Sequence, residues 1–498
     1  MFGKNLPALL RKTLQTREKF YLTTTLPYVN ADPHIGFAME LIQADVIARF
    51  KRQQGYEVFF NTGTDEHGIK IYRKAQEANM EPKAYCDIYA PKFNDLKVAL
   101  NVTYNNFIRT TDEHHIKAAQ EFWLRCQKNG DIYKKNYKVK YCVGCELEKT
   151  ESELVGGKCP IHPGQEIELI EEENYFFKYS KYQQKLLDLY GKNSGFVIPA
   201  SRLNEIKEFT KHGLEDFSIS RLKEKMPWGV DVPGDEKHVM YVWFDALVSY
   251  IAALGWTQDT KKFKEFWPGL QLAGKDNLRQ QSSMWQAMLM SAGLPNSTQI
   301  FIHGFISVSG QKMSKSLGNV ISPYDLVGKY GTDALRYYLL REITPTEDGD
   351  FTYEKFEQRY QSDLAGGIGN LLARTVTLAA KPDFRERKPT AKIKKEITLA
   401  KKESEKYLED FKFNEALKSI WELISFCDKY INEEKPWEGK ESAPQVISDV
   451  LFALEGISDL LLPFLPETAE KIKKAVDSKK SEILFPRIQK KVDIAGVF

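Results

Sequence analysis

The hydrophobic and polar positions in the first quarter of the chain predict strands that alternate with helices. Residues 20–25 are rich in threonine and aromatic side chains, which is typical of a strand. Pro33 follows Asp32, so we expect Asp32 to be the N-cap of a helix and Pro33 its first helical residue. Apolar residues then recur at helical spacing, at Ile35, Met39, Ile42 and Val46. Residues 57–61 predict a second strand, and the alternation continues to about residue 128, which predicts a parallel sheet of the dinucleotide-binding type.

Three further stretches complete the expected fold. Residues 239–246 are apolar almost throughout, so we expect a strand buried on both faces where the sheet resumes. Residues 300–302 predict another buried strand. From about residue 357 the apolar positions recur every three or four residues, which predicts a helix bundle. The expected fold class is therefore α/β: a Rossmann-type parallel-sheet domain that carries an insertion, followed by an all-α helix bundle.

Composition adds few constraints. A chain of 498 residues has room for about three domains, and its formal net charge of +3 means that any surface for nucleic acid must be local. No apolar run approaches the ~20 residues of a membrane helix, so we expect no membrane partner. Six unevenly spaced cysteines argue against a secreted disulfide framework, and we expect a cytoplasmic protein. Residues 1–17 carry four basic and no acidic residues; a transit peptide and a disordered extension remain open, and the lack of serines favours the extension.

One candidate for chemistry is a loop between Gly310 and Gly318. Glycine permits unusual backbone angles, so we expect this segment to be mobile. Two lysines in such a loop suit a polyphosphate, although a solvated basic loop has the same composition. The residues concerned are Lys312, Met313, Ser314, Lys315 and Ser316.

A second candidate lies far upstream, where residues 33–37 read Pro-His-Ile-Gly-Phe. His34 is expected at the start of a helix that leaves a strand, where free N–H groups and the helix dipole favour an anion. His34 can donate to a phosphate oxygen, and Gly36 allows a flat base to approach the backbone. A surface histidine at a helix start is the alternative.

Two short motifs, Cys-Val-Gly-Cys at residues 142–145 and Cys-Pro-Ile-His at residues 159–162, predict a metal site, which we call the knuckle. The spacing of these cysteines and the histidine suits four tetrahedral ligands, and three thiolates with one imidazole leave no position open for water. We therefore expect one structural Zn2+, since disulfide pairing of the same cysteines fits a cytosolic chain poorly. The ligands are Cys142, Cys145, Cys159 and His162.

A ligand pocket is a further candidate site. Asp65 follows the second strand, at the sheet edge where parallel sheets bind ligands, so it can meet a substrate amine; a helix-capping role fits it equally. Spacing alone does not distinguish a ligand pocket from a hydrophobic core for a further group of residues, because aromatic residues of a core have the same spacings. These residues are Trp243, Ala246, Tyr250 and Trp285.

The segment at residues 33–37 and the lysine loop at residues 312–316 together resemble the paired signatures of class I aminoacyl-tRNA synthetases. These signatures are usually His-Ile-Gly-His and Lys-Met-Ser-Lys-Ser. The second is complete here, whereas the first ends in Phe37 in place of histidine. The Cys, Cys, Cys, His order of the knuckle and the Glu-Asn-Tyr-Phe-Phe segment at residues 173–177 narrow the resemblance to the methionyl-tRNA synthetase family. It covers about residues 20–488.

This resemblance implies ATP-dependent ligation of L-methionine to tRNA(Met) through a methionyl-adenylate, with release of AMP and pyrophosphate. Mg2+ is expected with ATP, and a monomer by comparison with members that lack a dimerising tail. The implied domains are an N-terminal extension (1–18), two halves of the Rossmann catalytic domain (19–128 and 238–306), a connective insertion with the zinc knuckle (129–237), a connector with the lysine loop (307–356) and an anticodon-binding helical bundle (357–498).

Two other functions stay open. A related nucleotidyl transferase could act on another amino acid or small acid without tRNA, but it would not need the helical bundle. A catalytically inactive RNA-binding relative would not need intact His34, Gly36, Lys312 and Lys315.

The resemblance also assigns roles to residues. Catalysis falls to His34, Gly36, Lys312 and Lys315, and ATP binding to these with Phe37, Asp276, Met313, Ser314 and Ser316. The methionine pocket comprises Leu26, Tyr28, Asp65, Trp243, Ala246, Tyr250, Gln281 and Trp285, with Asp65 on the amino group and Gln281 where many members have histidine. The CAU anticodon is read by Asn370, Arg374, Pro436 and Trp437, although a surface ion pair and a bundle-capping tryptophan are alternatives for Arg374 and Trp437.

Overall fold

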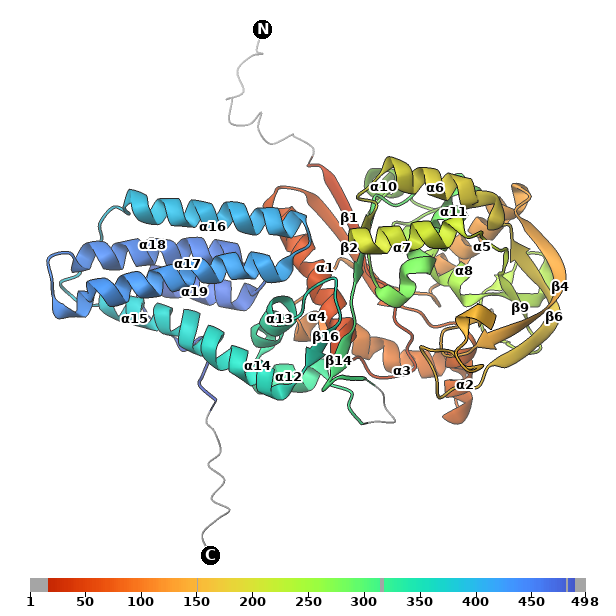
Figure 1. Ribbon diagram of the computed structural model, residues 1–498, viewed down its shortest axis with the longest axis horizontal. Coiled ribbons are helices and arrows are strands. Elements are labelled where there is room, and N and C mark those ends of the chain that lie inside the picture. Colours follow the sequence, from red (N-terminus) through yellow and green to blue (C-terminus); the bar gives the residue numbers. More distant parts are fainter. Residues whose placement is uncertain (1–16, 150, 314–317, 481, 489–498) are drawn as a thin grey trace, which may run out of the picture.

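The computed structural model describes residues 17–488, apart from residues 150, 314–317 and 481. Ser314, Lys315 and Ser316 therefore lie outside the described residues. The described chain is elongated, with a helical bundle at one end, a parallel sheet in the middle and an inserted, partly antiparallel region at the other end (Figure 1).

The central sheet has six parallel strands in the order β3-β2-β1-β12-β13-β7. Every residue of β12 and all but the first of β13 are buried, as a sheet covered on both faces requires. The Rossmann-type prediction is confirmed. The strands are β1 (Lys19–Thr23), β2 (Glu57–Thr64), β3 (Asn106–Arg109), β7 (Val197–Ile198), β12 (Leu270–Gly274) and β13 (Gln299–His303).

The prediction of a sheet strand over residues 239–246 is wrong. Strand β11 (Asp235–Met240) joins a small antiparallel sheet, and residues 242–246 form helix α8 (Val242–Ala246). An apolar run does not by itself distinguish a buried strand from a buried helix. The helical spacing of Trp243, Ala246 and Tyr250 was the available signal, and the parallel sheet resumes only at β12.

The expected cap of the first helix is also wrong by two residues. Helix α1 (Ile35–Gln53) starts after His34, whose Nδ1 accepts a hydrogen bond from the Gly36 amide at 3.0 Å. The imidazole thus satisfies a first-turn N–H group that Asp32 was expected to take. Asp32 instead pairs with Lys92 across 2.6 Å.

Four helices lie between the first strands and the insertion: α2 (Ile69–Glu77), α3 (Pro82–Asn94), α4 (Leu96–Ala99) and α5 (Glu113–Lys128). The insertion contains an antiparallel sheet in the order β5-β4-β6-β8. Strand β7 also falls within residues 129–237, yet it pairs with β13 at the edge of the main sheet. The other elements of this region are β4 (Ile132–Cys142), β5 (Leu147–Lys149), β6 (Glu168–Phe177), α6 (Gln183–Lys192), α7 (Ala200–Lys211), β8 (Phe217–Ser218), β9 (Ser220–Leu222) and β10 (Asp231–Val232).

After α8 the chain forms α9 (Ser249–Ala252), α10 (Thr260–Phe266) and α11 (Trp285–Ser291), and then a connector with a three-stranded sheet in the order β15-β14-β16. Its elements are β14 (Ile306–Val308), β15 (Gln311–Lys312), α12 (Pro323–Tyr330), α13 (Thr332–Arg341) and β16 (Gly349–Phe351). In Figure 1, α13 lies between α1 and the bundle.

The predicted helical region is confirmed. Its helices are α14 (Tyr353–Arg359), a π-helical turn (Tyr360–Gly369), α15 (Asn370–Ala379), α16 (Ala391–Glu409), α17 (Phe413–Glu434), α18 (Ala443–Leu461) and α19 (Pro466–Ser478). Within residues 17–488, outside the gaps given above, no helix has the length and apolar character needed to cross a membrane.

Candidate active site

A cavity of about 280 Å³ opens beyond the carboxyl ends of β1, β2 and β12. It is lined by seven of the eight residues expected in the pocket: Leu26, Tyr28, Asp65, Trp243, Ala246, Tyr250 and Gln281. The eighth, Trp285, is not among the lining residues but packs against one of them, with its ring centre 6.1 Å from that of Tyr250 in an edge-on contact. Residues spread over more than half of the chain thus meet at one sheet edge.

Asp65 is a buried carboxyl group with weak polar contacts. Helix α2 starts at Ile69 with Gly68 as its cap, so Asp65 does not cap it. The amide of His67 and the hydroxyl of Thr110 donate to Asp65 Oδ1 only at 3.5 Å. Burial, and after it the negative charge of Asp245, raise the pKa of Asp65 well above its usual value. A cation bound beside Asp65 would offset that cost and favour the ionised carboxylate.

Asp245 lies behind the pocket, between two histidines. Its carboxylate oxygens lie 2.6 Å from His67 Nδ1 and 2.6 Å from His115 Nε2. Burial alone would raise the pKa of Asp245, but the two imidazoles outweigh burial and hold the pKa at about 2. Since Asp245 precedes Ala246 and His67 follows Asp65 by two residues, this group connects two sides of the cavity.

The aromatic wall has polar atoms without hydrogen-bond partners. Tyr28 Oη, Trp243 Nε1, Trp285 Nε1 and Gln281 Oε1 are buried and unbonded among the described residues. Gln281 Nε2 donates to the hydroxyl of Tyr250. This bond connects two residues of the cavity lining.

A second cavity, of about 580 Å³, adjoins the first and shares Asp276 and Lys312 with it. Its lining contains the predicted residues His34, Gly36, Phe37, Asp276, Lys312 and Met313. The sequence motifs around His34 and Lys312, which are far apart in the chain, thus face one space.

His34 is held in one protonation state by its capping bond. Burial lowers its pKa, so the ring is neutral, and because Nδ1 accepts from the Gly36 amide, Nε2 carries the proton. A Cβ atom at Gly36 would come within 2.9 Å of the His34 ring. Glycine at this position therefore keeps the imidazole in place, with an N–H donor available for a ligand in the second cavity.

Lys312 is exposed on β15 and contacts the knuckle. Its Nζ donates to the carbonyl of Ile161 at 3.3 Å, next to the metal-ligand candidate His162. Gly144, Cys145, Ile161 and His162 line the first cavity together with Lys312. The knuckle is therefore a wall of the site.

The four expected metal ligands are gathered. The nearest ring nitrogen or sulfur atoms of Cys142, Cys145, Cys159 and His162 all lie within 4.8 Å of one another. Cys145 Sγ lies 3.2 Å from His162 Nδ1 and 3.5 Å from Cys159 Sγ. Burial, with the charge of Lys312, lowers the pKa of His162 to about 4, which keeps the imidazole neutral and able to bind a metal. Three sulfurs and one nitrogen fit a structural zinc site.

The residues expected to read an anticodon lie on the bundle. Asn370 and Arg374 are one turn apart on α15. Trp437 is 44% exposed on a short turn that begins with the buried Pro436, after α17. Arg374 pairs with Asp428 at 3.2 Å, so the ion-pair alternative describes a contact that does form.

Comparisons with known proteins agree with this arrangement. The family profile "tRNA synthetases class I (M)" matches residues 20–166 and 161–376, and "Anticodon-binding domain of tRNA ligase" matches residues 391–494. The methionine--tRNA ligase of Thermotoga maritima is 44% identical over 91% of this chain and 74% of its own length. That of Thermosynechococcus vestitus is 44% identical over 91% and 89%. The chain belongs to the methionyl-tRNA synthetase family.

A solved structure supports the same assignment. Mycobacterium tuberculosis methionyl-tRNA synthetase in complex with methionyl-adenylate has a TM-score of 0.87 and 37% sequence identity to this chain, and the match covers 92% of this chain and 93% of that chain. The resemblance inferred from the motifs is thereby confirmed.

For this member of the methionyl-tRNA synthetase family, sequence reasoning missed several residues around the cavities. Glu40 accepts from the amide and hydroxyl of Thr25 at 2.6 Å, and its other oxygen lies 2.7 Å from His303 Nε2. The helical spacing of Glu40 from Gly36 was a weak signal for it. His67, His115 and Asp245 come from three separate segments, and no local pattern connects them.

Proposed function

We propose that the chain ligates L-methionine to tRNA(Met) in two ATP-dependent steps at the joined cavities, releasing AMP and pyrophosphate. The observation that carries this proposal is the adjacency of an aromatic pocket with a buried carboxyl group to a space faced by His34 and Lys312. Family membership and the methionyl-adenylate bound to the related Mycobacterium tuberculosis enzyme support it.

Methionine would be held by charge at one end and by aromatic rings at the other. Asp65 would receive the ammonium group, whose positive charge offsets the burial of the carboxylate. Tyr28, Trp243 and Tyr250 would surround the side chain, and each sulfur–aromatic contact contributes ~0.3–1.5 kcal/mol. The remaining pocket residues are Leu26, Ala246, Gln281 and Trp285.

The first step joins the methionine carboxylate to the α-phosphorus of ATP and releases pyrophosphate. A carboxylate is already ionised at neutral pH, so the step needs no general base and depends on positioning and charge stabilisation. His34 Nε2–H would donate to the phosphate region, and Lys312 and Lys315 would stabilise the departing pyrophosphate. Mg2+ would arrive with ATP. The further ATP contacts are Gly36, Phe37, Asp276, Met313, Ser314 and Ser316.

Zinc is proposed in a structural role, as one Zn2+ ion held by Cys142, Cys145, Cys159 and His162. The donor set supports this choice, since soft thiolates with one imidazole suit zinc and leave no position for substrate.

In the second step a ribose hydroxyl at the tRNA 3′ end takes the methionyl group. We propose that Asn370, Arg374, Pro436 and Trp437 read the anticodon, because a partly exposed tryptophan beside an arginine suits an unstacked base. We propose that the protein acts as a monomer in the cytoplasm, with the domain limits implied by the family resemblance.

ATP–pyrophosphate exchange with each of the twenty amino acids, followed by tRNA charging, tests the function. We expect exchange with methionine and charging of tRNA(Met). Exchange with another acid, or methionine exchange without charging, would instead indicate a related nucleotidyl transferase, and inactivity in both assays an RNA-binding protein.

A further inference from the structure

Arg336 is a fully buried arginine at the point where the catalytic sheet, the connector and the bundle meet. It lies on α13, and its guanidinium contacts two other parts of the fold. Nε donates to the carbonyl of Phe464 at 2.7 Å and Nη2 to that of Pro463 at 3.0 Å, both between α18 and α19 of the bundle. Nη1 donates to the carbonyl of Leu100 at 3.0 Å, on the catalytic side just after α4.

The same guanidinium pairs with Asp45 of α1, whose carboxylate is also fully buried. Arg336 Nη2 lies 2.9 Å from Asp45 Oδ2. The other Asp45 oxygen accepts from the amide and hydroxyl of Thr103 at 2.7 and 2.6 Å, and Arg49 Nε lies 2.8 Å from Oδ2. A buried ion pair adds little net stability compared with apolar residues of similar volume, so the directional bonds of this pair point to a geometric role.

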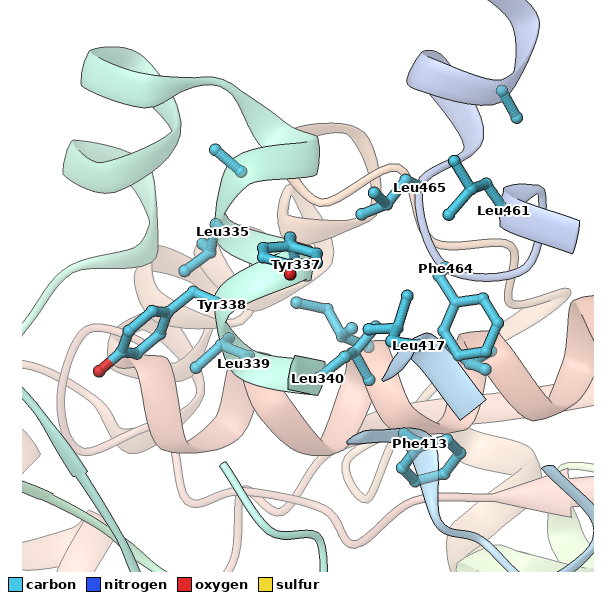
Figure 2. Close-up of a cluster of buried hydrophobic side chains, with 14 of the residues drawn as sticks. Leu335, Tyr337, Tyr338, Leu339, Leu340, Phe413, Leu417, Leu461, Phe464 and Leu465 are labelled. Atoms are coloured by element: carbon cyan, nitrogen blue, oxygen red, sulfur yellow. The ribbon is translucent and has the colours of Figure 1, made fainter. Parts of the chain in front are cut away.

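Apolar packing surrounds the arginine. Figure 2 shows Leu335, Leu339 and Leu340 of α13 in one buried cluster with Leu461, Phe464 and Leu465 of the bundle. Apolar contacts are non-directional, whereas hydrogen bonds constrain distance and angle. The apolar cluster therefore holds α13 against the bundle, and the hydrogen bonds of the Arg336 guanidinium restrict the angle between the bundle and the catalytic domain. Asp333 adds a second directional contact, because its Oδ2 accepts from the Thr468 amide of α19 at 2.6 Å.

Two helices extend from this junction towards the two proposed sites. His34 caps the start of helix α1, and Asp45 lies about three turns further on, roughly 16 Å at 1.5 Å per residue. Helix α18 has 19 residues and spans roughly 28 Å; it ends at Leu461 beside the junction and starts shortly after the Trp437 turn. A change of angle at Arg336 would therefore displace Trp437 relative to His34.

We infer that Arg336 is a positioning residue for the tRNA step: it sets the orientation of the bundle so that a tRNA bound at Trp437 presents its 3′ end at the adenylate. This inference rests on the proposed function. Adenylate formation uses only the joined cavities, so it should not depend on Arg336. The two activities should thus separate in variants of this residue.

The test measures methionine-dependent ATP–pyrophosphate exchange and tRNA(Met) charging on the same preparations. The main variant, Asp45→Asn combined with Arg336→Met, removes both charges of the buried pair together. Arg49, which also pairs with Asp45, keeps its hydrogen bonds to the backbone and side-chain oxygens of Asn101. Arg336→Lys is the milder second variant, because it keeps a charge beside Asp45 but loses the fork that spans Pro463 and Leu100. Val450→Ala, in the buried core of α18, is the control for a loosened bundle with an intact junction.

For the double variant we expect exchange within about twofold of the unchanged protein and a loss in charging of about tenfold to a hundredfold, mainly in kcat, as for a misplaced reactant. Arg336→Lys should show a smaller loss confined to charging. A minihelix substrate without the anticodon arm should be charged equally by all these proteins.

Equal losses in exchange and charging, unchanged charging in both junction variants, or the same charging defect in Val450→Ala would overturn the inference. Absence of methionine-dependent exchange in the unchanged protein is a different result, and it would overturn the proposed function as well.

Discussion

The guanidinium of Arg374 lies 5.2 Å from the ring centre of Trp437, on the surface of the bundle. Arg374 is also held by Asp428 at 3.2 Å and by the side-chain oxygen of Asn432 at 2.8 Å. The arginine therefore covers part of the indole, while 44% of Trp437 remains exposed. Trp437 and Arg374 therefore form one surface on the bundle.

From this contact we predict the effect of Trp437→Ala. Loss of a base–aromatic stack costs ~1–3 kcal/mol, so tRNA charging efficiency should fall roughly tenfold to a hundredfold. Exchange should be unchanged because the cavities lie elsewhere. Phe452→Ala, which truncates another partly exposed aromatic of the bundle, is the matched control and should charge tRNA normally. Equal losses in exchange and charging, with a lower melting temperature, would mean that Trp437 is a packing residue.

A second prediction concerns the knuckle. We expect elemental analysis to find one zinc ion per chain, and Cys145→Ser to lower zinc content and the melting temperature because metal binding is coupled to folding. Cys427→Ser, at a buried cysteine of the bundle outside the knuckle, should leave zinc content unchanged. Freshly purified protein without zinc would contradict the site.

Lys315 is expected to act on the departing pyrophosphate. Although this residue lies outside the described part of the chain, its motif predicts that Lys315→Ala slows adenylate formation by about a hundredfold or more, as loss of one preorganised charge contact does. Methionine binding should be nearly unchanged, and Gln311→Ala in the adjacent exposed strand should have little effect on either. Normal exchange rates in Lys315→Ala would support the solvated-loop alternative.

Methionine affinity should depend on the ionisation of Asp65. The pKa of this group is raised in the free protein, chiefly by burial, so the carboxyl is neutral below that pKa and ionised above it. Because the substrate ammonium pairs with the ionised form, affinity should fall as pH decreases through the raised pKa. Calorimetry over a pH series that begins above the ordinary carboxyl pKa of about 3.9 measures this trend.

Asp65→Asn is the companion variant. It should bind methionine more weakly and lose most of the pH dependence, since the amide does not titrate. An unchanged pH profile in this variant would assign the titration to another group.

The sequence determined those features whose signals are local. Helical periodicity after residue 357 predicts the bundle, and the spacing of Cys142, Cys145, Cys159 and His162 predicts the knuckle, because each depends on residues close together in the chain. The positions of three strands were likewise predicted from local sequence, with errors of a few residues at their ends: β1 from its threonine and aromatic content, β2 from the strand–helix alternation and β13 from a short apolar run. The pocket residues came from the family resemblance, because their spacing alone is equally typical of a core.

Only the tertiary structure decided features that depend on distant partners. Residues 239–246 contain both the end of a strand and a helix, and Asp245 within them is stabilised by His67 and His115 from other segments. The buried pair of Asp45 and Arg336 is separated by most of the catalytic half of the chain. Burying a charge is costly without a partner, so such residues are explained only once the fold has brought the partner into contact. A local sequence pattern does not indicate which distant residue will be in contact, so the partners of Asp245 and Asp45 were identified only from the structure.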